Sequence, residues 1–306
     1  MRALPTVERT AERPGPGPVP PAVLRSLDLA VLRRIESLVP GEHLTPQVGA
    51  GTELAMIRPY FPGDDVRHID WNVTARMQEP HVRVHVGERA LTSWLVLDTS
   101  ASMTFGTADR RKWDVAEGVA LSVGHFAVRR GNRLALATFG DHNPSVSPAR
   151  QGNRGLLALL LALRREPELE PAGPTSLGAA LARIGGLARR RAVIVVVSDF
   201  RGPRDWRARL LHLASRHDVV AVEIRDPREQ ELPDVGDLWL VDPETGRLLR
   251  VDTRSRRLRE RFEAAAAEER NDVVKALASL GVRHLVLSTS GDWLRSLAVF
   301  LRRRRT

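Results

Sequence analysis

The sequence predicts an α/β protein built on a mostly parallel sheet with helices on both faces. From residue 91 onward, apolar runs of strand length alternate with segments in which apolar residues recur at helical spacing. Two of the runs, 94–97 and 192–197, are apolar throughout, as expected of strands that are covered on both faces. Such alternation is typical of βαβ units and therefore of a Rossmann-like sheet.

The chain ahead of this domain follows a different pattern. Residues 1–21 are rich in proline and cannot supply a core, so we expect a disordered tail. Residues 22–39 carry apolar side chains at helical spacing and predict one amphipathic helix. Three short antiparallel strands are expected after it, at 54–60, 69–71 and 81–86. Residues 22–90 therefore predict a small N-terminal helix and β unit.

Within the main domain, expected at 91–301, strands and helices follow one another in order. The expected strands are 94–98, 134–139, 192–197, 219–224 and 282–287. The expected helices are 114–130, 155–163, 176–187, 206–215, 255–280 and one beginning at Asp292. Segments 238–241 and 248–251 predict a β-hairpin inserted at the sheet edge, within 226–253, and 302–306 is expected to be a basic tail.

Composition narrows the classes of protein to which the chain can belong. Its 306 residues are 42% hydrophobic, which is enough to bury a core. The absence of cysteine excludes disulfides and thiolate metal sites. No run reaches the about 20 apolar residues of a membrane-spanning helix, and the N-terminus lacks the apolar segment of a signal peptide. We therefore expect a cytoplasmic protein.

The formal net charge of +10 comes almost entirely from arginine, because Lys112 and Lys275 are the two lysines of the chain. A solvated basic surface is favoured over a nucleic-acid-binding one, since no basic stripe is interleaved with aromatic residues that would stack on bases. The arginines at 302–305 would suit contact with an anionic membrane surface, but a frayed helix end accounts for them as well.

A candidate metal loop follows the first fully apolar strand. Asp98, Ser100 and Ser102 offer one carboxylate and two hydroxyls, which are hard oxygen donors that suit Mg²⁺ or Mn²⁺. In an open α/β sheet, ligands gather where such strands end. This loop supplies too few ligands for an octahedral ion, so further oxygens must come from elsewhere in the chain.

Two later loops carry suitable oxygens. Thr175 lies just before a predicted helix, and Asp199 follows the second fully apolar strand. If the two apolar strands are neighbours, Asp98 and Asp199 end side by side, with Thr175 on an adjacent loop. The alternative is that these hydroxyls and acids are ordinary helix caps and strand ends.

At this point the chain resembles the von Willebrand factor A fold, whose metal-ion-dependent adhesion site combines D-x-S-x-S with a distant threonine and a distant aspartate. Asp98, Ser100, Ser102, Thr175 and Asp199 match this pattern in order. The resemblance implies that the three hydroxyls ligate the ion directly, while the two acids hold its waters. It also implies an open coordination position that takes a carboxylate from another protein. Pro174 stands where the family often has glycine.

A second stretch resembles a narrower family. Residues 58–71, RPYFPGDDVRHIDW, followed by Ala75 and Arg76, are similar to the signature of the domain-of-unknown-function 58 family, von Willebrand factor A-like proteins that accompany MoxR-type AAA+ ATPases. The later stretch 226–229, DPRE, is also similar to that family. The signature residues that we single out are Arg58, Tyr60, Gly63, Asp64, Asp65, Arg67, Asp70, Trp71 and Arg76.

The signature also has a reading from its residues alone. Gly63 suits a turn, and the adjacent acids can accept backbone N–H bonds there. The three arginines are expected to pair with the three acids Asp64, Asp65 and Asp70, which favours a structural role over a binding role. A nuclease-type acid cluster is a weaker alternative, because no lysine stands near these acids.

These observations favour a non-enzymatic, metal-dependent protein-interaction module. By resemblance it would act with a MoxR-type AAA+ ATPase, as an adaptor or chaperone-like cofactor that binds a client carboxylate. The sequence contains no G-x-x-x-x-G-K-[ST] loop with which it could hydrolyse ATP itself. The alternatives are a divalent-metal phosphohydrolase or nuclease using Asp98 and Asp199, and nucleic-acid binding through arginines.

Overall fold

The computed structural model describes residues 53–86, 91–129, 131–140, 144–163, 176–242 and 247–302. The predicted tail at 1–21, the predicted helix at 22–39, Pro174, Thr175 and residues 303–306 of the predicted basic tail lie outside these ranges. The chain divides into two compact units, and of the described residues the larger unit holds those from Leu91 onward and the smaller unit holds 53–86. Each unit is described by itself.

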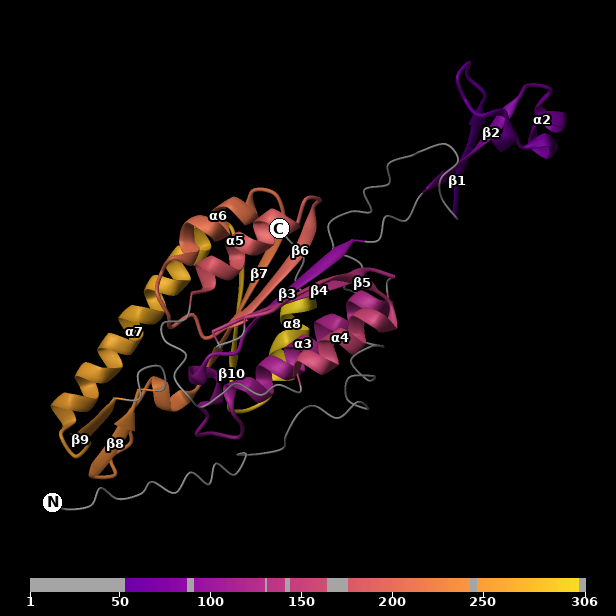
Figure 1. The fold of residues 1–306 in the computed structure, drawn as a ribbon. Coiled ribbons are helices and arrows are strands. Elements are labelled where there is room, and N and C mark those ends of the chain that lie inside the picture. The colour runs from indigo at the N-terminus through magenta and orange to yellow at the C-terminus, as the bar shows by residue number, and fades with distance from the viewer. Residues whose placement is uncertain are drawn as a thin grey trace. The chain divides into compact units, whose positions relative to one another are not determined.

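The larger unit is built on a six-stranded sheet with the order β10-β7-β6-β3-β4-β5 (Figure 1). Its strands are β3 (Thr92–Asp98), β4 (Arg133–Phe139), β5 (Val146–Gln151), β6 (Ala192–Ser198), β7 (Asp218–Arg225) and β10 (Arg283–Ser288). All neighbouring pairs are parallel except β4 and β5, which are antiparallel. This is the order of a doubly wound sheet with an antiparallel edge strand. The predicted α/β class with a mostly parallel sheet is confirmed.

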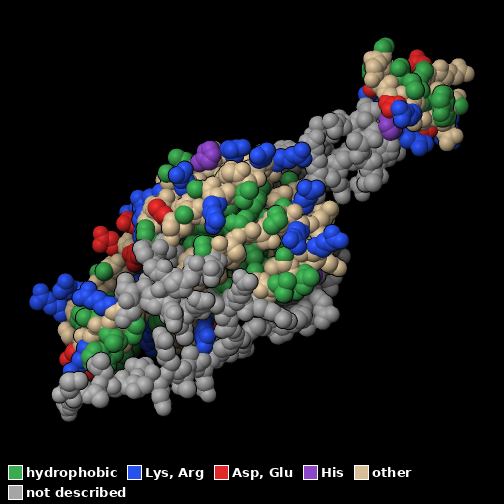
Figure 2. All heavy atoms as spheres, in the orientation of Figure 1, with side chains coloured by type: hydrophobic (Ala, Val, Ile, Leu, Met, Phe, Trp, Pro, Cys, Tyr) green, Lys and Arg blue, Asp and Glu red, His purple; other side chains and the backbone are tan. Residues whose placement is uncertain are grey.

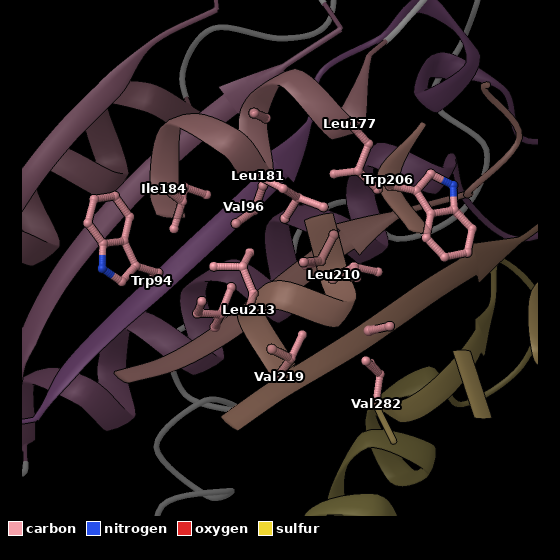
Figure 3. Close-up of a cluster of buried hydrophobic side chains, with 14 of the residues drawn as sticks. Trp94, Val96, Leu177, Leu181, Ile184, Trp206, Leu210, Leu213, Val219 and Val282 are labelled. Carbon is pink, nitrogen blue, oxygen red and sulfur yellow. The ribbon is translucent and has the colours of Figure 1, made fainter. Parts of the chain in front are cut away.

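Helices cover both faces of this sheet. They are α3 (Lys112–Arg129), α4 (Asn153–Leu163), α5 (Leu177–Leu187), α6 (Trp206–Ala214), α7 (Arg256–Ser279) and α8 (Trp293–Arg302). Because side chains alternate along a strand, Trp94 and Val96 of β3 enter one buried cluster with α5, α6 and α7 (Figure 3). Leu95 and Leu97 enter a second cluster with α3, α4 and α8. The two cores fix β3 at the centre of the unit.

Two differences from the predicted larger unit have clear causes. The edge strand β5 was not predicted, because its sequence VSPARQ contains proline and arginine and buries only part of one face. The expected hairpin is present as β8 (Asp237–Val241) paired with β9 (Leu248–Asp252). These two strands form a sheet of their own instead of extending the main one.

The smaller unit pairs β1 (Glu53–Pro59) with β2 (His81–Val86) in antiparallel register, as predicted. The predicted strand at 69–71 is wrong. Ile69 makes a single bridge to Val82, and Trp71 instead begins the helix α2 (Trp71–Met77). The cause is Asp70, whose carboxylate accepts hydrogen bonds from the first free N–H groups of that helix, at Asn72 and Val73.

Surface charge is dispersed over the face that Figure 2 shows. Basic side chains lie in several separate groups between hydrophobic and uncharged ones. Many arginines also pair with acids, as Arg250 does with Asp237 and Arg256 with Glu260. Among the described residues, no helix is long and apolar enough to cross a membrane.

Candidate metal centre

The candidate centre lies at the edge of the sheet where the parallel strands end. β3 and β6 are direct neighbours, with Leu97 opposite Val197, so Asp98 and Ser198 occupy the same level of the two strands. Asp199 follows immediately. The adjacency assumed from the sequence is therefore present, and it brings two predicted acids to one place.

Asp98 is a buried carboxylate that is held by local hydrogen bonds. One oxygen accepts the backbone N–H of Ser100 at 3.0 Å, and the other accepts the hydroxyl of Ser198 at 2.6 Å. Burial and, after it, the nearby charge of Asp199 raise the pKa of Asp98 to about 7. No described residue forms an ion pair with Asp98.

The two predicted serine ligands lie together beside these acids. The hydroxyls of Ser100 and Ser102 hydrogen-bond to each other at 3.0 Å, and the Ser102 hydroxyl lies close enough to Asp199 to help lower the pKa of that carboxyl. The short helix η2 (Ala101–Thr104) carries Ser102, and Ser100 stands at its N-cap position. At Gly140, whose φ is 94°, a Cβ would lie 2.8 Å from Cβ of Ser100, so only glycine allows the loop after β4 to approach so closely.

Lys112, which sequence reasoning did not single out, completes the cluster from the start of α3. Its fully buried ammonium donates to Asp199 at 2.5 Å and to Glu229 at 2.7 Å. Burial acts to raise the pKa of Asp199, but the Lys112 ammonium outweighs it and the pKa of Asp199 is lowered. The rarity of lysine in this chain was the one signal that could have pointed to it.

Glu229 reaches Lys112 because a neighbouring carboxylate, Asp226, organises its loop. Asp226 caps the short helix η3 (Pro227–Glu229), while the Glu229 side chain accepts the backbone N–H of Asp226. The fully buried Asp226 also accepts bonds from Thr107 and Thr289 at 2.6–2.8 Å. It therefore ties together the loops that follow β3, β7 and β10. This gives the DPRE stretch a structural role.

The described residues bring together four of the five predicted ligands: Asp98, Ser100, Ser102 and Asp199. The position of the fifth, Thr175, lies outside the described ranges. Its neighbour Ser176 caps α5 and donates a 2.6 Å hydrogen bond to Asp205, on the loop that Asp199 begins. The start of α5 is therefore anchored to that loop.

These oxygens fit a small hard cation. An octahedral Mg²⁺ with bonds of about 2.1 Å places neighbouring ligands about 3.0 Å apart, which matches the spacing of the two serine hydroxyls. Asp98, with which no described residue forms an ion pair, could also contribute a carboxylate to a bound cation. Asp98, Ser100, Ser102 and Asp199 are each less than a tenth exposed, so the cluster is more enclosed than the open coordination position implied by the resemblance.

A mixed-charge pocket adjoins the cluster at the ends of β6 and β7. Asp199 and Glu229 line it together with Arg201 and, from α7, Glu269 and Arg270. Arg201 lies 3.0 Å from Glu229 and 3.7 Å from Glu269, so ion pairs link the wall of the pocket to the partners of Lys112. Across the described ranges, no three histidine or acidic side chains gather as a metal cluster. The candidate centre thus depends on hydroxyl oxygens.

The signature residues form a separate network within the smaller unit. Arg58 donates two hydrogen bonds to Asp64, at 2.7 and 2.8 Å, and this pairing lowers the pKa of Asp64 to about 2. Gly63 has a φ of 109°, as a turn glycine requires. Arg67 lies 3.6 Å from Asp65, in the expected but exposed pair.

One expected pairing of the signature is wrong. Asp70 pairs with Arg83 of β2 at 2.8 Å, not with Arg76. The reason is that Asp70 caps α2, which directs its second oxygen toward the neighbouring strand. Tyr60 contributes its backbone N–H to Pro80, whereas Trp71 exposes 70% of its surface. The signature thus satisfies most of its own charges.

Comparison with known proteins places the chain among uncharacterized relatives. The model of a family described as "Protein of unknown function DUF58" matches residues 56–272. Uncharacterized proteins of Mycobacterium bovis and Mycobacterium tuberculosis are 39% identical over 284 residues, covering 93% of this chain and 89% of theirs. An uncharacterized protein of Mycobacterium avium is 39% identical over 158 residues, covering 52% of this chain and 93% of its own.

Solved structures with a similar fold share little sequence with the chain. BatB of Bacteroides thetaiotaomicron, a conserved hypothetical protein, is 13% identical with a TM-score of 0.45 over 69% of this chain and 97% of its own. An aerotolerance-related membrane protein of Bacteroides fragilis is 16% identical, with a TM-score of 0.46 and coverages of 69% and 96%. A von Willebrand factor type A protein of Catenulispora acidiphila is 13% identical, with a TM-score of 0.39 and coverages of 71% and 43%.

The Asp226 network generates a stability prediction. Burial opposes ionisation of Asp226, but the bonds from Thr107, Thr289 and Arg228 lower its pKa below the ordinary value. Asp226→Asn turns one acceptor into a donor that faces other donors, so we expect a loss of about 2–4 kcal/mol in the free energy of unfolding near pH 7. Urea unfolding measures it, with the exposed Asp272→Asn as the matched control.

The pH dependence of this loss has a definite sign. Because the pKa of Asp226 is lower in the folded chain than in the unfolded chain, its ionised form stabilises the fold at pH values above the unfolded pKa of about 4. This stability is lost as the pH falls through the pKa of Asp226 in the folded chain. The difference between wild type and Asp226→Asn should therefore narrow below about pH 4. A difference that is absent at pH 7, or equally large in acid, would contradict the assigned role of Asp226.

Proposed function

The chain belongs to the family described as protein of unknown function DUF58, and from that premise we propose that it is a non-enzymatic, metal-dependent protein-interaction module. Its centre would hold Mg²⁺ or Mn²⁺ through Ser100 and Ser102, supported by Asp98 and Asp199 and joined by Thr175. The proposed ligand is a carboxylate of a client protein. The proposed partner is a MoxR-type AAA+ ATPase that the module serves as adaptor.

The observation that carries this proposal is the convergence of Asp98, Ser100, Ser102 and Asp199 at the end of two neighbouring strands. The hydrogen-bonded hydroxyls of Ser100 and Ser102 have a spacing that also suits neighbouring ligands of a small cation, and they lie beside Asp98, which no described residue pairs with a cation. When bound, the ion would supply an electrophilic position for an incoming carboxylate oxygen. The residues of this chain hold and orient the oxygens around that position.

The charge distribution favours binding over hydrolysis. Two-metal hydrolytic sites commonly hold their ions with several carboxylates. Here one of the two nearby acids, Asp199, is already paired with the Lys112 ammonium, so Asp98, whose pKa is raised to about 7, is the acid left to supply a charge once it loses its proton. A single ion held mainly by hydroxyls suits the recognition of a carboxylate better than the activation of water on a phosphate.

The proposed partner follows from the family resemblance of the signature and from what the sequence lacks. A chain without a phosphate-binding loop needs a second protein if ATP hydrolysis is to act on its client. Arg58 pairs with Asp64 inside the signature, and Asp70 pairs with Arg83 of the neighbouring strand, which supports a structural role for this stretch within the smaller unit.

Metal binding is the direct test of the centre. We expect isothermal calorimetry to detect one Mn²⁺ or Mg²⁺ ion per chain, because Asp98 provides the uncompensated charge. Asp98→Ala should abolish this heat. Asp98→Asn, which retains hydrogen-bonding atoms, should raise the Kd for the ion at least about tenfold. The exposed Asp272→Ala serves as the matched control. Wild-type protein without heat for either ion would refute the metal claim.

The partner is tested by co-purification from the native host. A tagged chain should recover an AAA+ ATPase, and recovery should fall when a chelator is present or when Asp98 is replaced by alanine, if the ion bridges the assembly. Asp272→Ala should recover the ATPase as wild type does. Equal recovery with and without divalent ion would exclude a metal-bridged contact, and recovery without any AAA+ protein would exclude this partner.

A further inference from the structure

Lys112 is a fully buried charge that does not belong to the proposed ligands of the metal site. Its side chain is fully inaccessible, and burying an ammonium costs several kcal/mol unless strong partners compensate. An apolar side chain would pack at this position of α3 without that cost. The presence of lysine therefore indicates a function for its charge.

The contacts connect this charge to the candidate centre in a short chain. The Ser102 hydroxyl lies close enough to Asp199 to help lower the pKa of that carboxyl, and Asp199 accepts a hydrogen bond from the Lys112 ammonium at 2.5 Å. The predicted metal ligands and the lysine thus share one carboxylate. A divalent cation beside Ser100 and Ser102 would draw on the same negative charge that now stabilises Lys112.

Lys112 has a second anchor that does not depend on the centre. Glu229 accepts its ammonium at 2.7 Å, and Asp226 and Arg201 hold Glu229 in place. The Phe105 ring also lies 6.0 Å from the ammonium, within the range of a cation–π contact. If Asp199 turned its charge toward a bound ion, Lys112 would keep a paired carboxylate without leaving its place.

From these contacts we propose that Lys112 is a built-in counter-ion that competes with the divalent cation for Asp199 and so sets the affinity of the centre. This inference rests on the proposed metal-binding function and adds its regulation. When the centre holds no ion, Lys112 offsets the charge of Asp199 and so lessens the repulsion between the two buried acids. The same positive charge then opposes the incoming cation.

The chain offers an unusually clean comparison, because its other lysine is Lys275 on α7, which is exposed. Lys112→Met removes the charge and retains much of the side-chain volume, and Lys275→Met is the matched control. We expect calorimetry with Mn²⁺ to give a Kd at least about tenfold lower for Lys112→Met than for wild type, and an unchanged Kd for Lys275→Met. A smaller gain, no gain or a loss overturns the proposal.

The outcomes separate this inference from the proposed function. If wild type binds Mn²⁺ and Lys112→Met binds no more tightly, the inference fails and the metal function stands. If only Lys112→Met binds, the inference holds and metal dependence of the wild-type chain is refuted. If neither binds, both fail.

Folding of the variant is checked by circular dichroism and a cooperative melt, and Lys112→Gln replaces Lys112→Met if the latter does not fold. A measurement on wild type then gives an independent answer. With ¹⁵N-lysine labelling, the two side-chain ammonium signals are assigned by the Lys275→Met variant. Saturating Mg²⁺ should shift the Lys112 signal and leave Lys275 unchanged. An unmoved Lys112 signal in a protein that binds Mg²⁺ overturns the proposal.

Discussion

The adjacency of β3 and β6 is the constraint on which the candidate centre depends. Because these strands are parallel neighbours, Asp98 and Asp199 leave the sheet at the same edge, and the loops after them meet there. The two cores on either side of β3 hold this arrangement, since alternate residues of the strand are buried in opposite directions. A shift by one residue would exchange the two faces and separate the acids from the hydroxyls.

Charge balance then decides what the centre can do. Two carboxylates lie within one buried cluster, and the chain supplies a cation, Lys112, that pairs with Asp199 but not with Asp98. The pKa of Asp98, raised to about 7 by burial and by Asp199, records this imbalance. A divalent ion would balance the charge of Asp98, and the Lys112 ammonium would lower the affinity of the centre for that ion. The surrounding loops are fixed by Asp226, so the cluster does not depend on flexible side chains alone.

The sequence predicted the parts of the fold whose patterns are strong and local. Fully apolar strands, helical periodicity and the D-x-S-x-S spacing located the sheet and four of the converging side chains. The sequence-based prediction was wrong or incomplete where a tertiary contact decides the local structure or the pairing of a side chain. β5 is held by pairing with β4, α2 begins because Asp70 caps it, and Asp70 chooses Arg83 across the strand pair. Lys112 lies 87 positions from Asp199, and no local pattern links the two. The Thr175 ligand stays a prediction.

The most direct test of the account is a crystal structure of the chain in Mn²⁺, with anomalous scattering used to locate the ion. The account predicts one anomalous peak within about 2.2 Å of the hydroxyl oxygens of Ser100 and Ser102, with Asp98 and Asp199 beside it. The same map would show whether Thr175 joins the ligands. A crystal without a peak at these hydroxyls, in saturating Mn²⁺, would contradict the central claim.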